Sequence, residues 1–351
     1  MMNFQNKKPF WALLILGLGL VLYLENPFLT GPTDIETEPL SPQTSEPVLD
    51  KLPEEKPITL LLVGDIMLNR GVEYMMEKEG DWRFPFLKIA EDLKGVDVLF
   101  GNLEGPISNK GVKVGSIYSF RANPAAIQGL SFAGFDVLSI ANNHAFDYGR
   151  EALEDTFFRL KEAGIDYVGG GFNGEEAYSP IIKEVDGTKI AFLAYTNLGP
   201  ESWKAGEENS GIAWISENDF EKIKNDIKEA RGKADVLIVS LHAGEEYFLE
   251  PTQFQTQFSR AAIEAGANLV VGHHSHVAQG NERYKEGWIF YSLGNFVFDQ
   301  SFSEETMKGQ AVKVLIENDK IKIAVPMEIE INSYFQPDYS QFSREYTDGK
   351  I

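Results

Sequence analysis

The sequence contains no cysteine among its 351 residues, and this absence excludes several kinds of protein at once. Disulfides, iron–sulfur clusters, thiolate zinc sites and acylation on a lipobox cysteine are all ruled out. A secreted domain of this composition must be held by its core alone. With 43% hydrophobic residues, the chain is long enough for one large core or two modest ones.

Basic residues are also scarce. The chain has 32 Lys and Arg against 53 Asp and Glu, which gives a formal net charge of −21 and a pI near 4.7. No block of Lys and Arg stands out, so we expect no nucleic-acid partner. The acidic balance also disfavours docking onto anionic lipid beyond the anchor itself.

One long apolar run lies near the N-terminus. Lys7 and Lys8 precede an apolar stretch from Phe10 to Leu24, and no Lys or Arg occurs from Glu25 to Asp50. By the positive-inside rule, residues 1–25 form a cytoplasmic stub and a signal-anchor helix, a single pass that leaves the rest of the chain on the extracytoplasmic side of the cell membrane. The run is short for a full span, so a cleaved signal peptide and a buried core helix are alternatives. No small-x-small cleavage site follows the run, which favours the uncleaved anchor.

Composition divides the remainder of the chain. Residues 26–56 are rich in Pro, Glu, Asp, Thr and Ser, which predicts an extended linker that buries little apolar surface. One domain is predicted over residues 57–331, because neither Pro nor Gly marks a second linker. The tail at 332–351 carries several aromatic residues, and it either packs back on the domain or is mobile.

From Ile58 onward, short apolar runs alternate with amphipathic helical stretches, which predicts an α/β fold. The helical stretches are 150–163, with Leu153, Phe157 and Leu160 on one face, and 252–265. Runs this apolar are typical of strands covered on both faces. The runs are Ile58–Val63, Val96–Phe100, Asp136–Ala141, Lys189–Tyr195, Asp235–Leu241, Asn268–Val271 and Trp288–Leu293.

Polar residues follow these runs at the points where the strands should end. They include Asp65, Asn102, Glu104, Asn142, Asn143, His144, Asp147, His242, Glu245, Glu246, His273, His274, His276, Asn295 and Asp299, and all five histidines of the chain are among them. In open α/β sheets, ligands bind beyond the carboxyl ends of the strands. Imidazole and carboxylate donors without thiolate suit Zn, Mn or Fe. Two such ions close together can clamp a phosphoryl group and activate water.

Most of these residues also have a purely structural interpretation. Asp65 or Asp299 alone could cap a helix, Asn142 and Asn143 could form a turn, His242 could be a core histidine, Glu245 and Glu246 could be a solvated turn, and Gly169–Gly171 could be a plain turn. The His-x-His of His274 and His276 is a stronger signal, since alternate residues of an extended segment face the same way. The coincidence of five or six such loops at one edge favours a functional site.

Five longer segments carry a resemblance to a known family. They are Gly64–Met67, Gly101–Gly105, Ala141–Gly149, Gly272–His276 and Tyr291–Asp299. In this order they resemble the CapA family of bacterial capsule or poly-γ-glutamate synthesis proteins, a branch of the calcineurin-like metallophosphoesterases, over about residues 58–331. The resemblance implies a four-layer α/β/β/α sandwich of the metallophosphoesterase type, preceded by the N-terminal anchor helix.

The resemblance also implies residue roles. Metal ligands are expected at Asp65, Glu104, Asn143, His242, His274 and His276, holding one or two ions of Mn, Zn or Fe. His144 is the candidate acid or charge stabiliser, with Asp147 placed to orient its ring. Substrate contacts are assigned to Asn102, Arg121, His273 and Asn295. Two positions depart from the family pattern: Met67 stands where the first motif has a histidine, and Glu104 stands roughly where a bridging aspartate is usual. One metal position therefore lacks a nitrogen ligand.

Three functions fit these observations. The first is an assembly or export factor for capsule or poly-γ-glutamate, with capsule-synthesis membrane subunits as partners and an anionic polymer or phosphorylated compound as substrate. The second is a metal-dependent hydrolase of a phosphoester or polymer bond at the cell wall. The third is a non-catalytic polymer-binding module with a relic site. The complete set of Asn143, His144, His242, His274 and His276 favours a site in use, whereas Met67 favours altered metal use.

Overall fold

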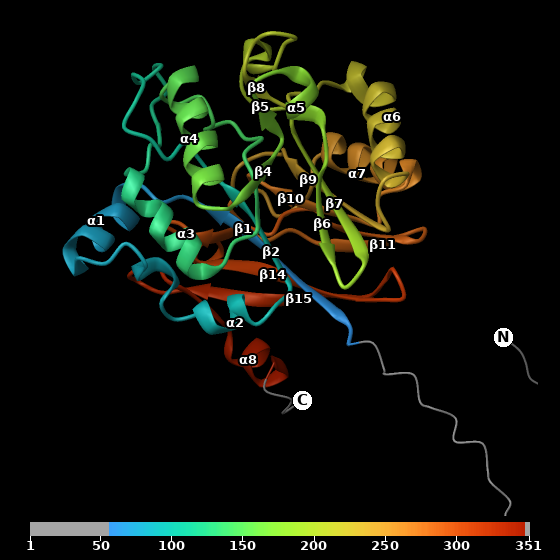
Figure 1. Ribbon diagram of the computed structural model, residues 1–351. Coiled ribbons are helices and arrows are strands. Elements are labelled where there is room, and N and C mark those ends of the chain that lie inside the picture. The colour runs from blue at the N-terminus through green and yellow to red at the C-terminus, as the bar shows by residue number, and fades with distance from the viewer. Residues whose placement is uncertain (1–55, 348–351) are drawn as a thin grey trace, which may run out of the picture. The chain divides into compact units, whose positions relative to one another are not determined.

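Residues 56–347 are described by the computed structural model, and the predicted anchor and nearly all of the predicted linker lie outside this range (Figure 1). Within the described range, no helix has both the length and the apolar character needed to cross a bilayer. The described residues build two large sheets with helices on their outer faces. The prediction of a mixed α/β fold is therefore confirmed.

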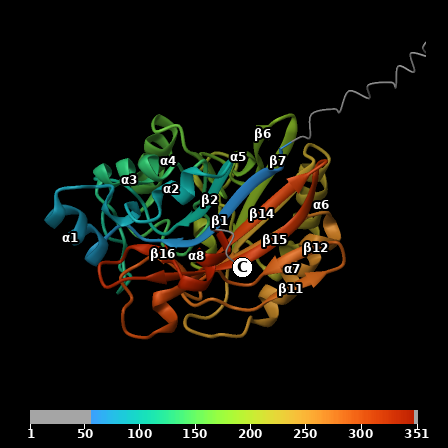
Figure 2. The same ribbon diagram turned by 90° about the horizontal axis from the view of Figure 1, so that it is seen from below.

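The first sheet has eight strands, seven of them in the order β16-β15-β14-β1-β2-β3-β4, with β13 pairing to β1. The strands β1 to β4 are mutually parallel, whereas β14 runs antiparallel to β1 and pairs with the long strand β15 (Figure 2). The strands are β1 (Ile58–Ile66), β2 (Val98–Leu103), β3 (Val137–Ser139), β4 (Asp166–Val168), β13 (Asn295–Val297), β14 (Lys308–Glu317), β15 (Lys320–Ile331) and β16 (Pro337–Tyr339).

The second sheet has six strands in the order β11-β12-β10-β9-β7-β6. Its four central strands are parallel, and the edge strands β11 and β6 are antiparallel to their neighbours. The strands are β6 (Ile181–Val185), β7 (Thr188–Thr196), β9 (Val236–His242), β10 (Leu269–His273), β11 (Asn281–Tyr284) and β12 (Gly287–Phe290), and a separate pair is formed by β5 (Gly170–Gly171) and β8 (Gly211–Ile212).

The helices cover the outer faces of the two sheets (Figure 1). Helix α7 begins with a capping box, in which Thr252 and Gln255 satisfy each other's backbone groups. The helices are α1 (Arg70–Glu79), α2 (Ala90–Lys94), α3 (Ile127–Ala133), α4 (Arg150–Glu162), α5 (Gly174–Tyr178), α6 (Phe220–Arg231), α7 (Gln253–Ala265) and α8 (Gln341–Thr347).

Three apolar clusters hold the layers together. Alternate residues of β1 face opposite sides, so Leu60 packs between the two sheets while Leu61 packs under the helices of the first sheet. Between the sheets, Phe100 stacks on Phe192 with ring centroids 5.4 Å apart. On the far side, α6 and α7 cover the second sheet through residues such as Phe258. The layers thus run helices, sheet, sheet, helices.

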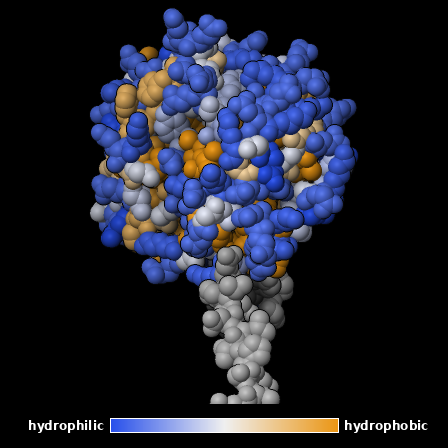
Figure 3. All heavy atoms as spheres, turned by 45° about the vertical axis from the view of Figure 1, so that its right-hand side comes forward, coloured by the Kyte–Doolittle hydropathy of each residue, from blue (hydrophilic) through white to orange (hydrophobic). Residues whose placement is uncertain are grey.

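The surface and the chain end complete the described unit. On the face drawn in Figure 3, hydrophilic residues predominate and apolar residues form small patches, as expected from the acidic composition. In the predicted tail, β16 pairs with β15 and α8 follows it. This part of the tail is therefore a structured edge of the first sheet.

Candidate metal centre

The candidate ligands come from the carboxyl ends of parallel strands in both sheets. Asp65, near the end of β1, is in register with Asn102 of β2 and with Asn295 of β13. In the second sheet, His242 ends β9 beside His273, the last residue of β10. The loops after these strands therefore meet at one edge, as expected for a ligand site in a parallel sheet.

Asp65 is fully buried and held as an anion. Its Oδ1 accepts a hydrogen bond from Asn102 Nδ2 (2.8 Å), and its Oδ2 accepts one from the backbone N–H of His274 (3.1 Å). Burial alone would raise the pKa of Asp65, but His273, His276 and the Asn102 amide together hold that pKa below its usual value. Asp65 is thus ionised at neutral pH, which is the form that binds metal.

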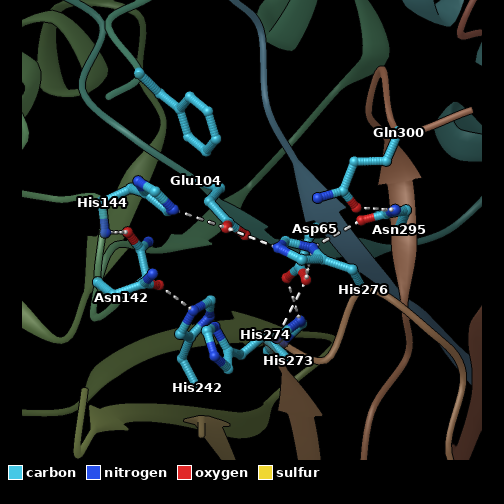
Figure 4. A network of polar contacts seen from close by, with 12 residues as sticks. Asp65, Glu104, Asn142, His144, His242, His273, His274, His276, Asn295 and Gln300 are labelled. Atoms are coloured by element: carbon cyan, nitrogen blue, oxygen red, sulfur yellow. Dashed lines mark hydrogen bonds and ion pairs between the residues drawn. The ribbon is translucent and has the colours of Figure 1, made fainter. Parts of the chain in front are cut away.

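Glu104 lies between two imidazoles (Figure 4). Its Oε1 is 3.7 Å from Nε2 of His144 and 3.7 Å from Nε2 of His276. Among the described residues, no hydrogen bond reaches this buried oxygen. Burial, followed by the charge of Asp65, raises the pKa of Glu104 well above its usual value. Because a buried carboxylate is costly without a compensating cation, this position fits a bound cation.

Asp65, Glu104 and His276 form a compact ligand set. Each offers a donor atom, and these atoms all lie within 4.8 Å of one another. The Nδ1 of His276 is 3.0 Å from Asn295 Oδ1, an acceptor that places the proton on Nδ1 and leaves Nε2 free to bind. Two carboxylates and one imidazole suit Mn, Zn or Fe.

The remaining predicted ligands, Asn143, His242 and His274, form a second group. The Nε2 of His242 faces Oδ1 of Asn143 at 2.8 Å, and the ring centroids of His242 and His274 are 4.9 Å apart. Burial, followed by the neighbouring His274, lowers the pKa of His242 well below its usual value, and burial lowers the pKa of His274 to about 3. Both rings are therefore neutral at pH 7, as metal ligation requires.

Asn102 joins the two groups. Its Nδ2 is 2.8 Å from Asp65 Oδ1, 3.4 Å from Glu104 Oε2 and 3.3 Å from His242 Nδ1. Its Oδ1 accepts a hydrogen bond from Asn142 Nδ2 (3.2 Å). Asn102 has no exposed surface, so its amide orients the candidate ligands and presents no face to a substrate in this conformation.

Two further predicted substrate contacts are also buried behind the ligands. The Nδ1 of His273 is 3.2 Å from Asp65 Oδ1, and neither ring nitrogen of His273 forms a hydrogen bond within the described residues. Asn295 is buried against the ring of His276. Both residues therefore support ligands from beneath.

Arg121, the fourth predicted substrate contact, is engaged away from the cluster. Its Nη1 donates hydrogen bonds to the carbonyls of Lys110 (3.0 Å) and Gly111 (3.2 Å). Its guanidinium lies 4.0 Å from the ring centroid of Tyr148. These contacts connect Arg121 to the loop around residue 110 and to Tyr148.

His144 and Asp147 are brought together as the sequence analysis expects. The Nδ1 of His144 is 2.6 Å from Asp147 Oδ2, and the same carboxylate oxygen accepts the backbone N–H of Phe120 (2.7 Å). The Phe120 ring packs against the imidazole with centroids 4.0 Å apart. The ring is thereby fixed with Nε2 directed at Glu104.

Met67 supplies no donor to the cluster. Its side chain is fully buried, and its sulfur accepts a hydrogen bond from the backbone N–H of Asn69 (3.1 Å). The methionine is therefore part of the core beneath the loop. The nitrogen ligand expected at this position in the family pattern is absent.

The sequence analysis did not single out Arg70, which lies beside the cluster. Its guanidinium pairs with Asp299, and Asp299 also accepts the backbone N–H of Gly71 (2.9 Å) at the start of α1. Asp299 is therefore a helix cap and an ion-pair partner. No motif marks Arg70. The signal in the sequence that could have drawn attention to it is its position five residues after Asp65.

Comparison with known proteins gives one family and several relatives. Residues 59–300 match the model of the family described as bacterial capsule synthesis protein PGA_cap. The chain is 34% identical over 287 residues to the capsule biosynthesis protein CapA of Bacillus anthracis, a match that covers 80% of this chain and 69% of the relative. It is 36% identical over 245 residues to the PGA biosynthesis protein CapA of Bacillus subtilis, covering 69% of this chain and 63% of the relative. A solved structure described as a putative 5′-nucleotidase from Staphylococcus aureus is similar with a TM-score of 0.48 and 17% identity, over 84% of this chain and 58% of the other.

Proposed function

Because the chain belongs to the bacterial capsule synthesis family PGA_cap, we propose that it is an accessory protein in the synthesis or export of capsular poly-γ-glutamate. In this proposal, residues 1–25 tether it to the cell membrane and the domain lies on the extracytoplasmic side. Its partners are the membrane subunits of the synthesis system, and its ligand is an anionic polymer or a phosphorylated compound. The names of the two Bacillus relatives, which refer to capsule and PGA biosynthesis, support a role in polymer synthesis.

A divalent metal site is the second part of the proposal, within a four-layer fold of the metallophosphoesterase type. The observation that carries it is the buried Oε1 of Glu104, which lies between two imidazoles and receives no hydrogen bond from any residue in the range 56–347. One Mn, Zn or Fe ion is held by Asp65, Glu104 and His276, and a second can be held by Asn143, His242 and His274. A bound ion supplies Lewis acidity, which polarises an oxyanion such as a phosphoryl or carboxyl group.

The metal site is tested by measuring two quantities for the same variants: the metal content of the purified protein and the polymer output of the strain. We expect purified full-length protein to retain close to stoichiometric metal, and His276→Ala, which removes one of the three compact ligands, to lose most of it. In a strain that lacks the native copy, the same variant should reduce polymer output. Lys233→Ala, which removes an exposed ion pair with Glu229, is the matched control and should change neither quantity. Wild-type protein that carries no metal and is unaffected by strong chelation would refute the metal site.

Hydrolysis of a phosphoester or polymer bond is the second candidate function, and the geometry of His144 favours it. Asp147 holds the imidazole by its Nδ1, so that Nε2 faces the ligand cluster. In that position a protonated His144 can donate a proton to a leaving group, a role typically worth about 10²- to 10⁴-fold in rate. The third candidate, a binding module without catalysis, needs no such proton.

His144→Gln distinguishes these two candidates. Gln keeps size and polarity, and His144 is not among the proposed ligands, so we expect metal content and thermal stability to stay near wild type. Polymer output should nonetheless be abolished if His144 transfers a proton. Normal output at normal protein abundance would exclude catalysis through this residue and favour the binding module.

The proposed topology has its own test. Protease added to intact protoplasts should degrade the domain, because the positive-inside rule places it outside the membrane. The control is the same protein in lysed cells, where degradation shows that the cleavage sites are accessible. Full protection in sealed protoplasts, with degradation after lysis, would contradict the extracytoplasmic location.

A further inference from the structure

Arg70 is a basic side chain that lies one aromatic ring away from each of two candidate-site histidines. Its guanidinium carbon is 4.9 Å from the ring centroid of Phe120 and 5.9 Å from that of Phe298. The Phe120 ring packs on His144 at 4.0 Å, and the Phe298 ring packs on His276 at 4.7 Å. Both imidazoles flank Glu104, so the guanidinium lies at the border of the ligand cluster.

The guanidinium is fixed on one edge and open on the other. Its Nε lies 3.1 Å from both carboxylate oxygens of Asp299, and its Nη2 pairs with the same group. Asp299 is itself held by the Gly71 N–H, and its side chain is only 10% exposed. Among the described residues, no hydrogen bond engages Nη1 of Arg70, whose side chain is 33% exposed. The free edge can therefore accept a ligand without breaking the ion pair.

The backbone at Arg70 also indicates that this side chain is needed there. Its φ is +52°, in the left-handed region that glycine adopts most readily. A residue other than glycine persists in such a conformation only when its surroundings determine it, and such positions cluster at functional sites. Here the surroundings are the Asp299 carboxylate and two aromatic rings.

The charge of Arg70 complements a site that otherwise repels anions. Asp65, Glu104 and Asp147 place three buried acidic side chains around the imidazoles of this site. Arg70 is near enough to lower the pKa of Glu104. A guanidinium with a planar, outward-facing edge is suited to bind the oxygens of carboxylates and phosphates.

We propose that Arg70 is the oxyanion-binding residue of this centre, held by Asp299 so that its free edge binds the anionic group of the ligand. The ligand class is a carboxylate or phosphate next to the metal, and the inference rests on the proposed function of the site. Arg121, which the sequence analysis predicts as a substrate contact, donates hydrogen bonds from its guanidinium to the carbonyls of Lys110 and Gly111.

The experiment measures anion binding directly on purified full-length protein. Calorimetric titrations use inorganic phosphate in one series and a γ-linked glutamate oligomer in the other, so the two sources of the oxyanion are distinguished. The variants are Arg70→Gln, which removes the charge, and Arg70→Lys, which keeps the charge and loses the fork. Arg83→Gln is the matched control, because Arg83 also pairs with an aspartate, Asp81, and lies over an aromatic ring, yet none of its contacts is with a cluster residue.

We expect Arg70→Gln to weaken binding of the preferred anion about 10- to 100-fold, because the charged hydrogen bonds to the anion are lost. Arg70→Lys should weaken binding less, because the positive charge remains and only the two-pronged hydrogen bonding is lost. Arg83→Gln should bind as wild type does. Metal content is measured in the same samples. If metal is retained and Arg70→Gln binds both anions as tightly as wild type, the inference is wrong while the metal site stands. If the wild type holds no metal, the proposed metal site fails. The inference about Arg70 is then decided by anion binding alone: weaker binding of phosphate or the oligomer by Arg70→Lys, which keeps the positive charge beside Asp299, would still support it.

Discussion

Individual residues of the cluster have the burial and charge that suit a bound cation. Glu104 is buried and has a raised pKa, no described residue donates a hydrogen bond to its Oε1, and burial lowers the pKa of the neighbouring His276. Burying a carboxyl group in this way costs stability, because desolvation penalises its charged form. On the proposed function, a bound metal ion would offset this cost.

Glu104→Gln tests this trade-off. A neutral amide of the same shape removes the buried carboxylate, so we expect the metal-free protein to gain about 1 kcal/mol or more in its free energy of unfolding. The same change removes a ligand, so retained metal should fall sharply. Urea denaturation after chelation gives the first quantity, and elemental analysis gives the second.

Glu229→Gln is the matched control, because Glu229 is exposed on α6 and only pairs with Lys233. It should leave both quantities near wild type. A metal-free Glu104→Gln protein that is less stable than wild type, yet holds as much metal, would show that Glu104 is a structural group and not a ligand.

At the scale of elements, the site depends on a close backbone contact between β10 and the segment after β12, where there is no room for a Cβ atom. A Cβ on Gly272, in β10, would lie 1.8 Å from the carbonyl oxygen of Tyr291. The loop with His274 and His276 begins directly after this strand. The backbone contact between β10 and the segment after β12 therefore sets where both histidines lie.

Gly272→Ala should accordingly displace these two strands. We expect a loss of about 1–3 kcal/mol in unfolding free energy, as for other overpacked sites, together with a loss of bound metal. Gly280→Ala is the control, since a Cβ there meets no atom within 4 Å. Urea denaturation of both variants gives the comparison. Equal stability and equal metal content in the two variants would contradict this view of the strand contact.

The apolar runs of the sequence predict some elements well and miss others. β1, β9 and β10 are buried on both faces, so their hydrophobic residues are continuous and the runs mark them within a few positions. In β14 and β15 the buried residues are interrupted by partly buried or exposed ones, and a search for continuous apolar runs does not find these strands. The limit is physical, because a half-exposed antiparallel strand need not be uniformly apolar.

At the scale of the whole molecule, the two sheets bring together residues that no local pattern connects. The motifs indicate that Asp65, His242 and His276 share one edge, and the structure places them there. The sequence does not indicate that Asn102 is buried among the ligands, or that Arg70 lies one aromatic ring away from His144 and His276. Those facts depend on side-chain direction in loops from distant strands, which sequence spacing does not determine.

The buried histidines make the stability of the metal-free molecule depend on pH. In the unfolded chain they titrate near 6.5, whereas in the folded protein the pKa of His274 is about 3 and that of His242 is well below 6.5. The unfolded state therefore binds more protons between about pH 6.5 and 3. Stability is complete above that window and is lost as the pH falls through it, partly offset by Glu104, whose raised pKa acts in the opposite direction.

His274→Asn should remove one of the groups that bind a proton when the chain unfolds in this pH range. We expect the slope of unfolding free energy against pH, below pH 6.5, to become shallower by about 1.4 kcal/mol per pH unit. Urea denaturation of chelated protein at several pH values measures the slope. Identical slopes for wild type and variant would mean that His274 is not buried in its neutral form.

The central claim is that Asp65, Glu104 and His276 hold a divalent metal ion, and anomalous scattering from a crystal of the purified protein tests it most directly. Data collected on both sides of the Mn, Fe and Zn absorption edges identify the element and its position. We predict an anomalous peak among the donor atoms of these three residues. Native crystals with no peak at any of the three edges, grown from protein whose stability is unchanged by chelation, would contradict the account.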